Sequence, residues 1–223
     1  FALVRALVPP PLLGRMDCVL RARAAEVMAA LGSRPIGIGS REGYHELVQR
    51  SPGRFDVPID VTTEAEQLGP DALPWLPIVQ SVLGPEAAPS FCGVVFSRPG
   101  SPAQQWHIDS PHEGIEHREA HALNVLVALA DVPLEAGPTE VARGSHRLTN
   151  HLRAPWLRRD DLLYQTATEI TPCTLGPLAA TPAAEAHAMR AGDCLLFDDR
   201  ALHRGLANRS SAERWVAYFS YAR

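Results

Sequence analysis

The segment RWVAYFSY, residues 214–221, decides the fold class, because its side chains alternate with a period of two. In a β-strand, successive side chains project to opposite faces, so this alternation predicts a strand. Arg214, Val216, Tyr218 and Ser220 share one predicted face. The other face carries only apolar and aromatic side chains: Trp215, Ala217, Phe219 and Tyr221.

Further short runs of apolar or alternating residues precede this strand, divided by turn residues, and we expect each to be a strand. They cover residues 55–61, 91–97, 105–109, 122–129, 140–142 and 189–197, with a short strand within residues 1–10. Two segments have helical character instead: residues 12–31, with apolar side chains at steps of three and four, and residues 71–84. The pattern predicts a mainly β protein in which two helices back an antiparallel β-sandwich or jelly roll.

Length and composition favour a single domain. The chain has 223 residues, of which 46% are hydrophobic and 21% charged, as is usual for soluble globular proteins. We expect one domain over residues 1–223, with 1–88 as a helical and mixed support and 89–223 as the jelly-roll core. The Pro-rich stretch 148–188 is interpreted as a loop that carries a short helix.

The charge balance and the cysteines narrow the class of protein. A net charge of −4 and a pI near 6.1 argue against a nucleic-acid partner, and no apolar run is long enough to span a membrane. The four cysteines are scattered without a CxxC pair, which predicts reduced thiols and a soluble, intracellular protein. Because the chain begins with Phe1 rather than Met, we interpret it as a trimmed form whose targeting segment, if any, lies outside view.

The tripeptide His107-Ile108-Asp109 is the first candidate for chemistry. In a strand, residues i and i+2 project from the same face, so the imidazole and the carboxylate would point into the same space. A second histidine from a distant strand would complete a facial triad of two histidines and one carboxylate, which is typical of non-heme Fe(II) oxygenases. His203 is the best candidate, because it follows the apolar run at residues 194–197.

Arg214 gives this weak motif its context. It lies eleven residues after His203, at the start of the last strand. A guanidinium is a planar, permanently charged fork that suits a carboxylate held in a bidentate manner. A cosubstrate with a carboxylate far from the metal needs such an anchor.

Three segments together resemble the phytanoyl-CoA dioxygenase-like branch of the Fe(II)/2-oxoglutarate dioxygenases. The first is PGSPAQQWHID, residues 99–109; the second is GPTEVARGSH, residues 137–146; the third runs from Ala191-Gly192-Asp193 to Arg214. The spacing of His203 and Arg214 is similar to that of the distal histidine and the 2-oxoglutarate arginine of this family. The likeness covers most of the chain.

The resemblance implies a double-stranded β-helix of the jelly-roll or cupin-like type with flanking, mostly N-terminal helices. It implies that iron is bound by His107, Asp109 and His203, and that Arg214 holds the distal carboxylate of 2-oxoglutarate. It also implies that O2 is consumed and that further residues, Gln104, Asn124 and Thr139, surround the cosubstrate. Relatives that halogenate lack the carboxylate, so Asp109 favours hydroxylation or a related oxidation.

The expected substrate is a small organic molecule, and few residues of the sequence indicate which side chains contact it. Four basic residues of the N-terminal half are candidates for binding an anionic group: Arg34, Arg41, His45 and Arg54, with Arg54 preferred because it leads into a predicted strand. His112, close to the predicted triad, is a further candidate. Two alternatives stay open: a non-catalytic or non-redox metal-binding protein of cupin type, and a protein hydroxylase or demethylase.

Overall fold

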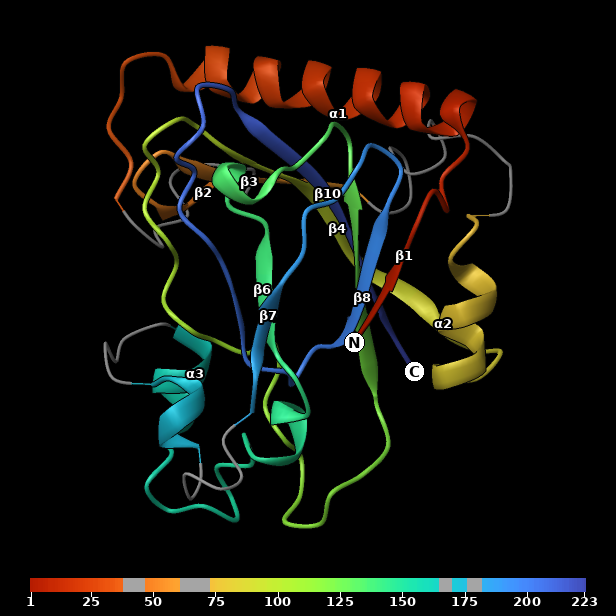
Figure 1. Ribbon diagram of the computed structural model, residues 1–223, viewed down its shortest axis with the longest axis vertical. Coiled ribbons are helices and arrows are strands. Elements are labelled where there is room, and N and C mark those ends of the chain that lie inside the picture. The colour runs from red at the N-terminus through yellow and green to blue at the C-terminus, as the bar shows by residue number, and fades with distance from the viewer. Residues whose placement is uncertain (38–46, 61–72, 165–169, 176–181) are drawn as a thin grey trace.

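The computed structural model describes residues 1–37, 47–60, 73–164, 170–175 and 182–223. Within them, the chain forms two antiparallel sheets with helices around them (Figure 1). The larger sheet has seven strands in the order β1-β8-β5-β10-β4-β3-β2, and the smaller has three in the order β7-β6-β9. The predicted double-stranded β-helix with flanking helices is confirmed.

The elements have the following bounds. The helices are α1 (Pro10–Leu31), α2 (Leu76–Leu83) and α3 (Arg159–Tyr164), with short 3-10 turns at Leu134–Ala136, Ser145–Arg147 and Pro172–Thr174. The strands are β1 (Ala2–Val4), β2 (Val48–Ser51), β3 (Arg54–Ile59), β4 (Ala88–Ser97), β5 (Ala122–Ala128), β6 (Thr139–Ala142), β7 (Ala184–Ala186), β8 (Cys194–Asp198), β9 (His203–Gly205) and β10 (Arg214–Ala222).

Helix α1 packs on the outer face of the larger sheet. It begins in a proline run, where the missing N–H groups cost nothing, and it ends at Gly32, whose φ of 60° favours glycine. Its apolar side chains recur at steps of three and four, as predicted. They meet the aromatic side chains of the sheet in one core, which includes Met16, Leu20, Phe96 and Trp215. Helix α2 covers another part of the same face.

Strand β10 lies inside the larger sheet, between β5 and β4, so both of its edges are hydrogen-bonded to neighbouring strands. Its predicted alternation is confirmed. Trp215, Ala217, Phe219 and Tyr221 belong to the outer core under α1 and α2. On the inner face, Val216 packs with Val141 of strand β6, so this face looks toward the smaller sheet. The polar residues of β10 therefore face the space between the sheets.

The segment 105–109 is not the predicted strand. Within it only His107 pairs with another strand, in an isolated bridge with His203. The next two backbone N–H groups donate to different parts of the chain, Ile108 to the carbonyl of Leu162 and Asp109 to that of Asp199. Because three separate partners hold three successive residues, no regular ladder forms.

Two further predicted elements are shorter than expected. The strand predicted at 189–197 is β8, which starts at Cys194, because Gly192 with a φ of 88° turns the chain before it. The helix predicted at 71–84 begins at Leu76, and residues 71 and 72 lie outside the described part. The loop predicted at 148–188 carries α3, as expected, and also the short strand β7.

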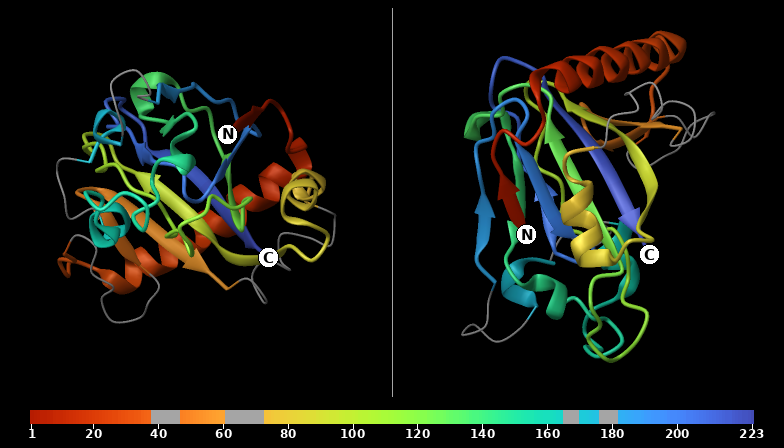
Figure 2. Two further views of the ribbon diagram at one scale, coloured as in Figure 1. Left: turned by 90° about the horizontal axis from the view of Figure 1, so that it is seen from below. Right: turned by 90° about the vertical axis from the view of Figure 1, so that its right-hand side faces the viewer.

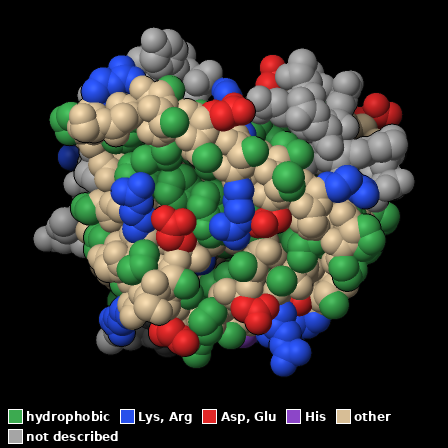
Figure 3. Space-filling model, turned by 90° about the horizontal axis from the view of Figure 1, so that it is seen from above, with side chains coloured by type: hydrophobic (Ala, Val, Ile, Leu, Met, Phe, Trp, Pro, Cys, Tyr) green, Lys and Arg blue, Asp and Glu red, His purple; other side chains and the backbone are tan. Residues whose placement is uncertain are grey.

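The layers are visible in Figure 2, whose right-hand view separates the smaller sheet from the strands of the larger one. Figure 3 views the surface over α1 and shows basic and acidic side chains interspersed among apolar ones, without a large area of one charge. None of the described helices has the length and apolar character that crossing a bilayer requires. All four cysteines are free thiols, as predicted.

Candidate metal centre

Three side chains that can bind a metal converge where the two sheets face each other: His107, Asp109 and His203, hereafter the triad. Their potential ligand atoms all lie within 4.8 Å of one another. The Nε2 atom of His203 is 3.4 Å from Oδ2 of Asp109, and Nε2 of His107 is 4.0 Å from Oδ1. Both histidines are buried, whereas 45% of the Asp109 side chain is exposed. The triad is therefore open to solvent on its carboxylate side.

Backbone hydrogen bonds bring together ligands that are 96 residues apart in the sequence. His203 is the first residue of β9, and its N–H donates to the carbonyl of His107 at 2.9 Å. The N–H of His107 donates back to the carbonyl of His203 at 3.0 Å. This reciprocal bridge fixes the two imidazoles side by side, with ring centroids 4.3 Å apart.

Both imidazoles are oriented with Nε2 toward the centre of the triad. Nδ1 of His107 donates to the carbonyl of Gln105, and Nδ1 of His203 to that of Ala201, each at 2.9 Å. A hydrogen bond of this kind fixes the neutral tautomer with a lone pair on Nε2, the form that binds a metal. Burial, followed by the neighbouring His203, lowers the pKa of His107 to about 3, so this imidazole is neutral at physiological pH.

The Asp109 carboxylate is held by the larger sheet. Nδ2 of Asn124, on β5, donates to Oδ2 of Asp109 at 2.6 Å. The hydroxyl of Ser220, which pairs in register with Asn124 from β10, donates to the Oδ1 of that amide. Asn124 is therefore oriented by Ser220 and directed at Asp109. Its expected contact with a cosubstrate remains a prediction.

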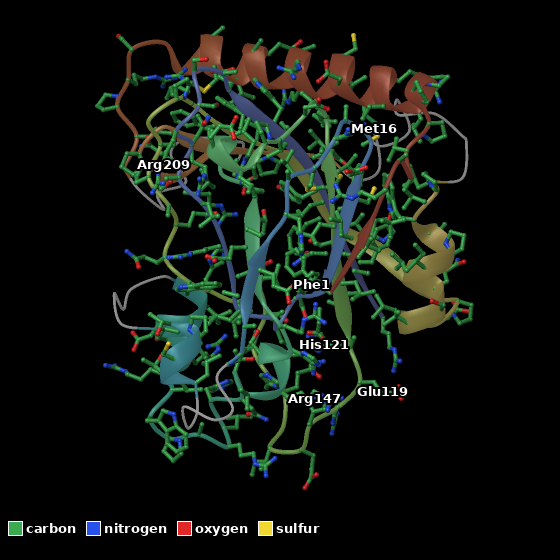
Figure 4. The ribbon with its side chains drawn as sticks, in the orientation of Figure 1. Phe1, Met16, Glu119, His121, Arg147 and Arg209 are labelled. Carbon is green, nitrogen blue, oxygen red and sulfur yellow. The ribbon has the colours of Figure 1, made fainter. Side chains whose placement is uncertain are left out.

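A second set of polar contacts fixes the residue after Asp109. The hydroxyl of Ser110 donates to the carboxylate of Asp199 and lies 3.0 Å from Nε2 of His121. Burial raises the pKa of Asp199 to about 6, although the Ser110 hydrogen bond opposes this shift. His121 lies in the half of the molecule remote from α1 (Figure 4), so the contacts among Ser110, Asp199 and His121 lie in that half.

Arg214 has the position and the free hydrogen-bonding groups that a buried carboxylate requires. Only 4% of the residue is exposed. Its Nη1 donates to the carbonyl of Gly137, whereas its Nε is buried without any hydrogen-bond partner. No carboxylate among the described residues pairs with it, and burial lowers its pKa to about 10. A buried guanidinium without a counter-ion is costly, so the arrangement favours an anionic ligand.

Arg54 is a correction to the sequence prediction, because it does not line an open mouth. The residue is fully buried, and its guanidinium donates to the hydroxyl of Ser97 and to the carbonyls of Gly205 and Leu206. Burial, and then the charge of Arg214, lower the pKa of Arg54 to about 9. Its hydrogen bonds join the edge of the larger sheet to the end of β9.

Gln104 and Thr139, the two other residues expected around a cosubstrate, lie beside Gly205, which Arg54 also contacts. Oε1 of Gln104 accepts a hydrogen bond from the N–H of Gly205 at 3.0 Å. Thr139 pairs with Gly205 and is two residues before the buried Val141, so both side chains project from one face of β6 toward the larger sheet. Their contacts with a cosubstrate remain predictions.

His112 is also a correction, because it does not face a substrate space. The residue is 5% exposed, and its Nε2 lies 3.0 Å from the hydroxyl of Thr149. Burial, and then the charge of Arg200, lower its pKa to about 4. Arg34 is exposed and donates to carbonyls at the end of α1, which also differs from its expected position at the mouth. Arg41 and His45 lie outside the described residues.

Sequence reasoning missed the polar residues that the larger sheet adds to the triad. Ser220 and Tyr218 share the predicted face of Arg214, so the period of two in residues 214–221 was the signal that could have found them. Arg50 and Asp56, on β2 and β3, had no such signal, because their pairing depends on which strands become neighbours.

The residues present fit a ferrous ion and a dicarboxylate. Two neutral imidazoles and one carboxylate leave open positions on the metal, as in non-heme Fe(II) sites. Arg214, which pairs with no carboxylate among the described residues, fits an anionic group. It lies on the inner face of β10, the strand that also carries Ser220.

Two comparisons place the chain among known proteins. The family model described as Phytanoyl-CoA dioxygenase (PhyH) matches residues 44–216. Among solved structures, AviO1 from Streptomyces viridochromogenes Tue57 superposes with a TM-score of 0.60 at 18% identity, over 97% of this chain and 86% of AviO1.

Two further structures contain ligands. The epimerase SnoN from nogalamycin biosynthesis, in complex with Fe3+, alpha ketoglutarate and nogalamycin RO, has a TM-score of 0.63 at 20% identity, over 99% of this chain and 78% of SnoN. HygX from Streptomyces hygroscopicus, with nickel and 2-oxoglutarate, has a TM-score of 0.60 at 14% identity, over 99% of this chain and 81% of HygX. At these identities, the likeness shows a shared fold.

Proposed function

Because the chain belongs to the phytanoyl-CoA dioxygenase family of 2-oxoglutarate-dependent non-heme iron enzymes, we propose that it hydroxylates, or otherwise oxidises, a C–H bond of a small organic molecule. In this proposal, His107, Asp109 and His203 hold Fe(II), and Arg214 binds the distal carboxylate of 2-oxoglutarate. Iron and 2-oxoglutarate together supply the oxidant from O2, with succinate and CO2 as coproducts.

The observation that carries the proposal is the pairing of two features. The triad presents two Nε2 lone pairs and a carboxylate within 4.8 Å. The buried Arg214 has an unpartnered Nε and no acidic partner among the described residues. A cosubstrate that carries a carboxylate at each end would satisfy both features at once, with one end at the metal and the other at the guanidinium.

The protein has three tasks in this reaction. The backbone bridge between His107 and His203 keeps both imidazoles in place. Asn124 orients the Asp109 carboxylate through the hydrogen bond to its Oδ2. The exposed side of Asp109 leaves an approach for the substrate, and the buried histidines limit water on the opposite side.

The alternative of a non-redox metal-binding protein has less support. A protein that only stores or senses a metal has no use for a buried guanidinium whose Nε lacks a hydrogen-bond partner, as that of Arg214 does. A protein hydroxylase has no specific observation in its favour. Support for a small substrate is indirect: the structures of SnoN and HygX contain nogalamycin RO and hygromycin B, respectively.

Aerobic incubation with Fe(II) and 2-oxoglutarate tests the proposed reaction class. We expect slow succinate formation even without a substrate, because enzymes of this class decarboxylate some 2-oxoglutarate unproductively. The rate should depend on added Fe(II) and should vanish in His203→Ala. Wild-type enzyme that forms no succinate with Fe(II), O2 and a panel of small molecules would contradict the proposal.

A further inference from the structure

Arg50 and Asp56 form an ion pair on the inner side of the larger sheet, the side that faces the smaller sheet and the triad. Nε and Nη2 of Arg50 both donate to Oδ2 of Asp56, at 2.9 and 2.5 Å. Asp56 pairs in register with Val95 on β4, on the same face of the sheet as Arg54 and Ser97. The Asp56 side chain is 4% exposed, whereas the Arg50 side chain is 43% exposed.

The buried Asp56 needs an explanation other than stability. Burying a carboxylate and pairing it is often no better for stability than an apolar pair of the same size. Tyr218 shares its environment: burial, and then the negative charge of Asp56, raise the pKa of this phenol. Gly93 makes room for the phenol, because a Cβ there would lie 2.6 Å from the Tyr218 hydroxyl oxygen. Residues of three strands, Asp56 of β3, Gly93 of β4 and Tyr218 of β10, thus help to hold the Arg50 guanidinium in place.

The structure describes no partner for the remaining edge of this guanidinium. Nη1 of Arg50 has no hydrogen-bond partner among the described residues, and its other two nitrogens both bond to the same carboxylate oxygen. Tyr218, beside Asp56, shares its face of β10 with Ser220. Ser220 orients Asn124, which donates to Asp109, so the ion pair and the support of the triad lie on the same face of the larger sheet.

We propose that Arg50 binds a carboxylate of the organic substrate and so positions the substrate beside the triad. The inference rests on the proposed function, because iron at the triad defines where the substrate must lie. The guanidinium has the three properties that such a contact needs. It is fixed by a buried partner, its Nη1 has no partner among the described residues, and it is partly exposed, as Asp109 of the triad also is.

The surrounding charges favour a singly charged carboxylate over a phosphate. Asp56 and Asp109 both repel a second negative charge on the ligand.

Arg50 therefore takes the place that the sequence had suggested for Arg54. The two residues are four positions apart: Arg50 lies on the edge strand β2, and Arg54 lies on its neighbour β3. Arg54 is fully buried, with bonds to one hydroxyl and two carbonyls, whereas Arg50 is almost half exposed, with one edge free.

The experiment uses wild-type enzyme with Mn(II) in place of Fe(II) and saturating 2-oxoglutarate, so that no turnover occurs. The probes are benzoate and cyclohexanecarboxylate, each compared with its neutral amide. Paramagnetic relaxation of the probe protons by Mn(II) reports both the affinity and the proximity to the metal. The variant is Arg50→Gln. The matched control is Arg143→Gln, because Arg143 is an exposed arginine whose Nε and Nη2 also bind a carboxylate, that of Glu185.

In the wild type, the acids should bind at least about tenfold more tightly than the amides, as expected for charge-assisted hydrogen bonds. Arg50→Gln should remove this preference, and Arg143→Gln should retain it. If Arg50→Gln does not fold because Asp56 is left unpaired, the double variant Arg50→Gln/Asp56→Asn removes both charges and should likewise lose the preference.

Three results would overturn the proposal. The wild type shows no preference for acids over amides, the preference survives in Arg50→Gln, or Arg50→Gln weakens 2-oxoglutarate binding as much as probe binding. The last result would assign Arg50 to the cosubstrate. A titration of the wild type with Mn(II) and 2-oxoglutarate alone precedes these measurements. Failure at that step rejects the proposed function itself, whereas normal cosubstrate binding with a failed probe preference rejects only the role of Arg50.

Discussion

Arg54 and Arg214 lie on either side of Ser97, in register across the three neighbouring strands β3, β4 and β10. Both guanidinium groups are buried, and neither has a carboxylate partner among the described residues. Their hydrogen bonds differ. Arg54 donates to Ser97 and to two backbone carbonyls, whereas the Nε of Arg214 has no partner. The first arginine therefore supports the structure, and the second is left for a ligand.

Replacing Arg214 with methionine should weaken 2-oxoglutarate binding by about 10- to 100-fold, because hydrogen bonds to a charged group are lost in a buried site. Metal binding should change little. The dissociation constants of 2-oxoglutarate and Mn(II), measured by calorimetry, check both statements. Arg209→Gln is the control, because Arg209 is an exposed arginine of the loop before β10. Equal cosubstrate affinity in wild type and Arg214→Met would contradict the assignment.

Replacing Arg54 with methionine should lower the free energy of unfolding by about 2–4 kcal/mol, because one hydroxyl and two carbonyls lose their donor in the core. Denaturant titration measures this change. Arg34→Met is a matched control, since Arg34 also donates to two backbone carbonyls but is exposed, and it should cost less than about 0.5 kcal/mol. A loss for Arg54→Met as small as that of the control would show that Arg54 is not a structural clamp.

The period of two in residues 214–221 predicted correctly which side chains share a face of β10, and the structure shows that one face enters the outer core and the other looks toward the smaller sheet. The pattern could be recognised because it depends only on successive residues of one strand. The helix at residues 12–31 was predicted for the same reason, and it starts only two residues earlier, at Pro10. Local periodicity, the motif around His107 and the resemblance to a known family together predicted the fold and the convergence of three ligands.

The contacts between strands could not be predicted from the sequence. The strand expected at 105–109 is absent because its hydrogen bonds go to three distant places. The choice between Arg50 and Arg54 depends on Asp56, whose partner is set by the bulge at which β2 shifts its register against β3. Asn124 was associated with the cosubstrate through the family resemblance, and nothing in the sequence indicates that Ser220 also turns its amide toward Asp109.

Replacing Asn124 with alanine should weaken metal binding by about 10- to 100-fold, the usual effect of losing a group that orients a metal ligand. Ser220→Ala should have a smaller effect in the same direction, because it acts on Asp109 only through Asn124. Competition with a coloured chelator gives the Mn(II) affinities. If Asn124→Ala leaves metal affinity unchanged and weakens 2-oxoglutarate binding, then Asn124 contacts the cosubstrate.

Replacing Gly137 with alanine should destabilise the protein by more than about 2 kcal/mol. Gly137 has a φ of 74°, and a Cβ there would collide with the backbone oxygens of Leu206 and Ala207. Because the Gly137 carbonyl accepts a hydrogen bond from Arg214, 2-oxoglutarate affinity should fall as well. Gly114→Ala is the control, since nothing lies within 4 Å of its position. Thermal unfolding and calorimetry measure the two effects, and a stable Gly137→Ala with normal affinity would contradict both.

The most direct test of the iron and 2-oxoglutarate site is an anaerobic titration with both components, followed by the visible charge-transfer absorption that arises when 2-oxoglutarate chelates Fe(II). We predict a band that saturates at one equivalent of Fe(II) in the wild type and in His187→Ala, where the histidine is exposed and outside the triad. In His203→Ala the band should be absent, and in Arg214→Met it should require much more 2-oxoglutarate. Wild-type enzyme without this band, or His203→Ala with an undiminished one, would contradict the assignment of the triad.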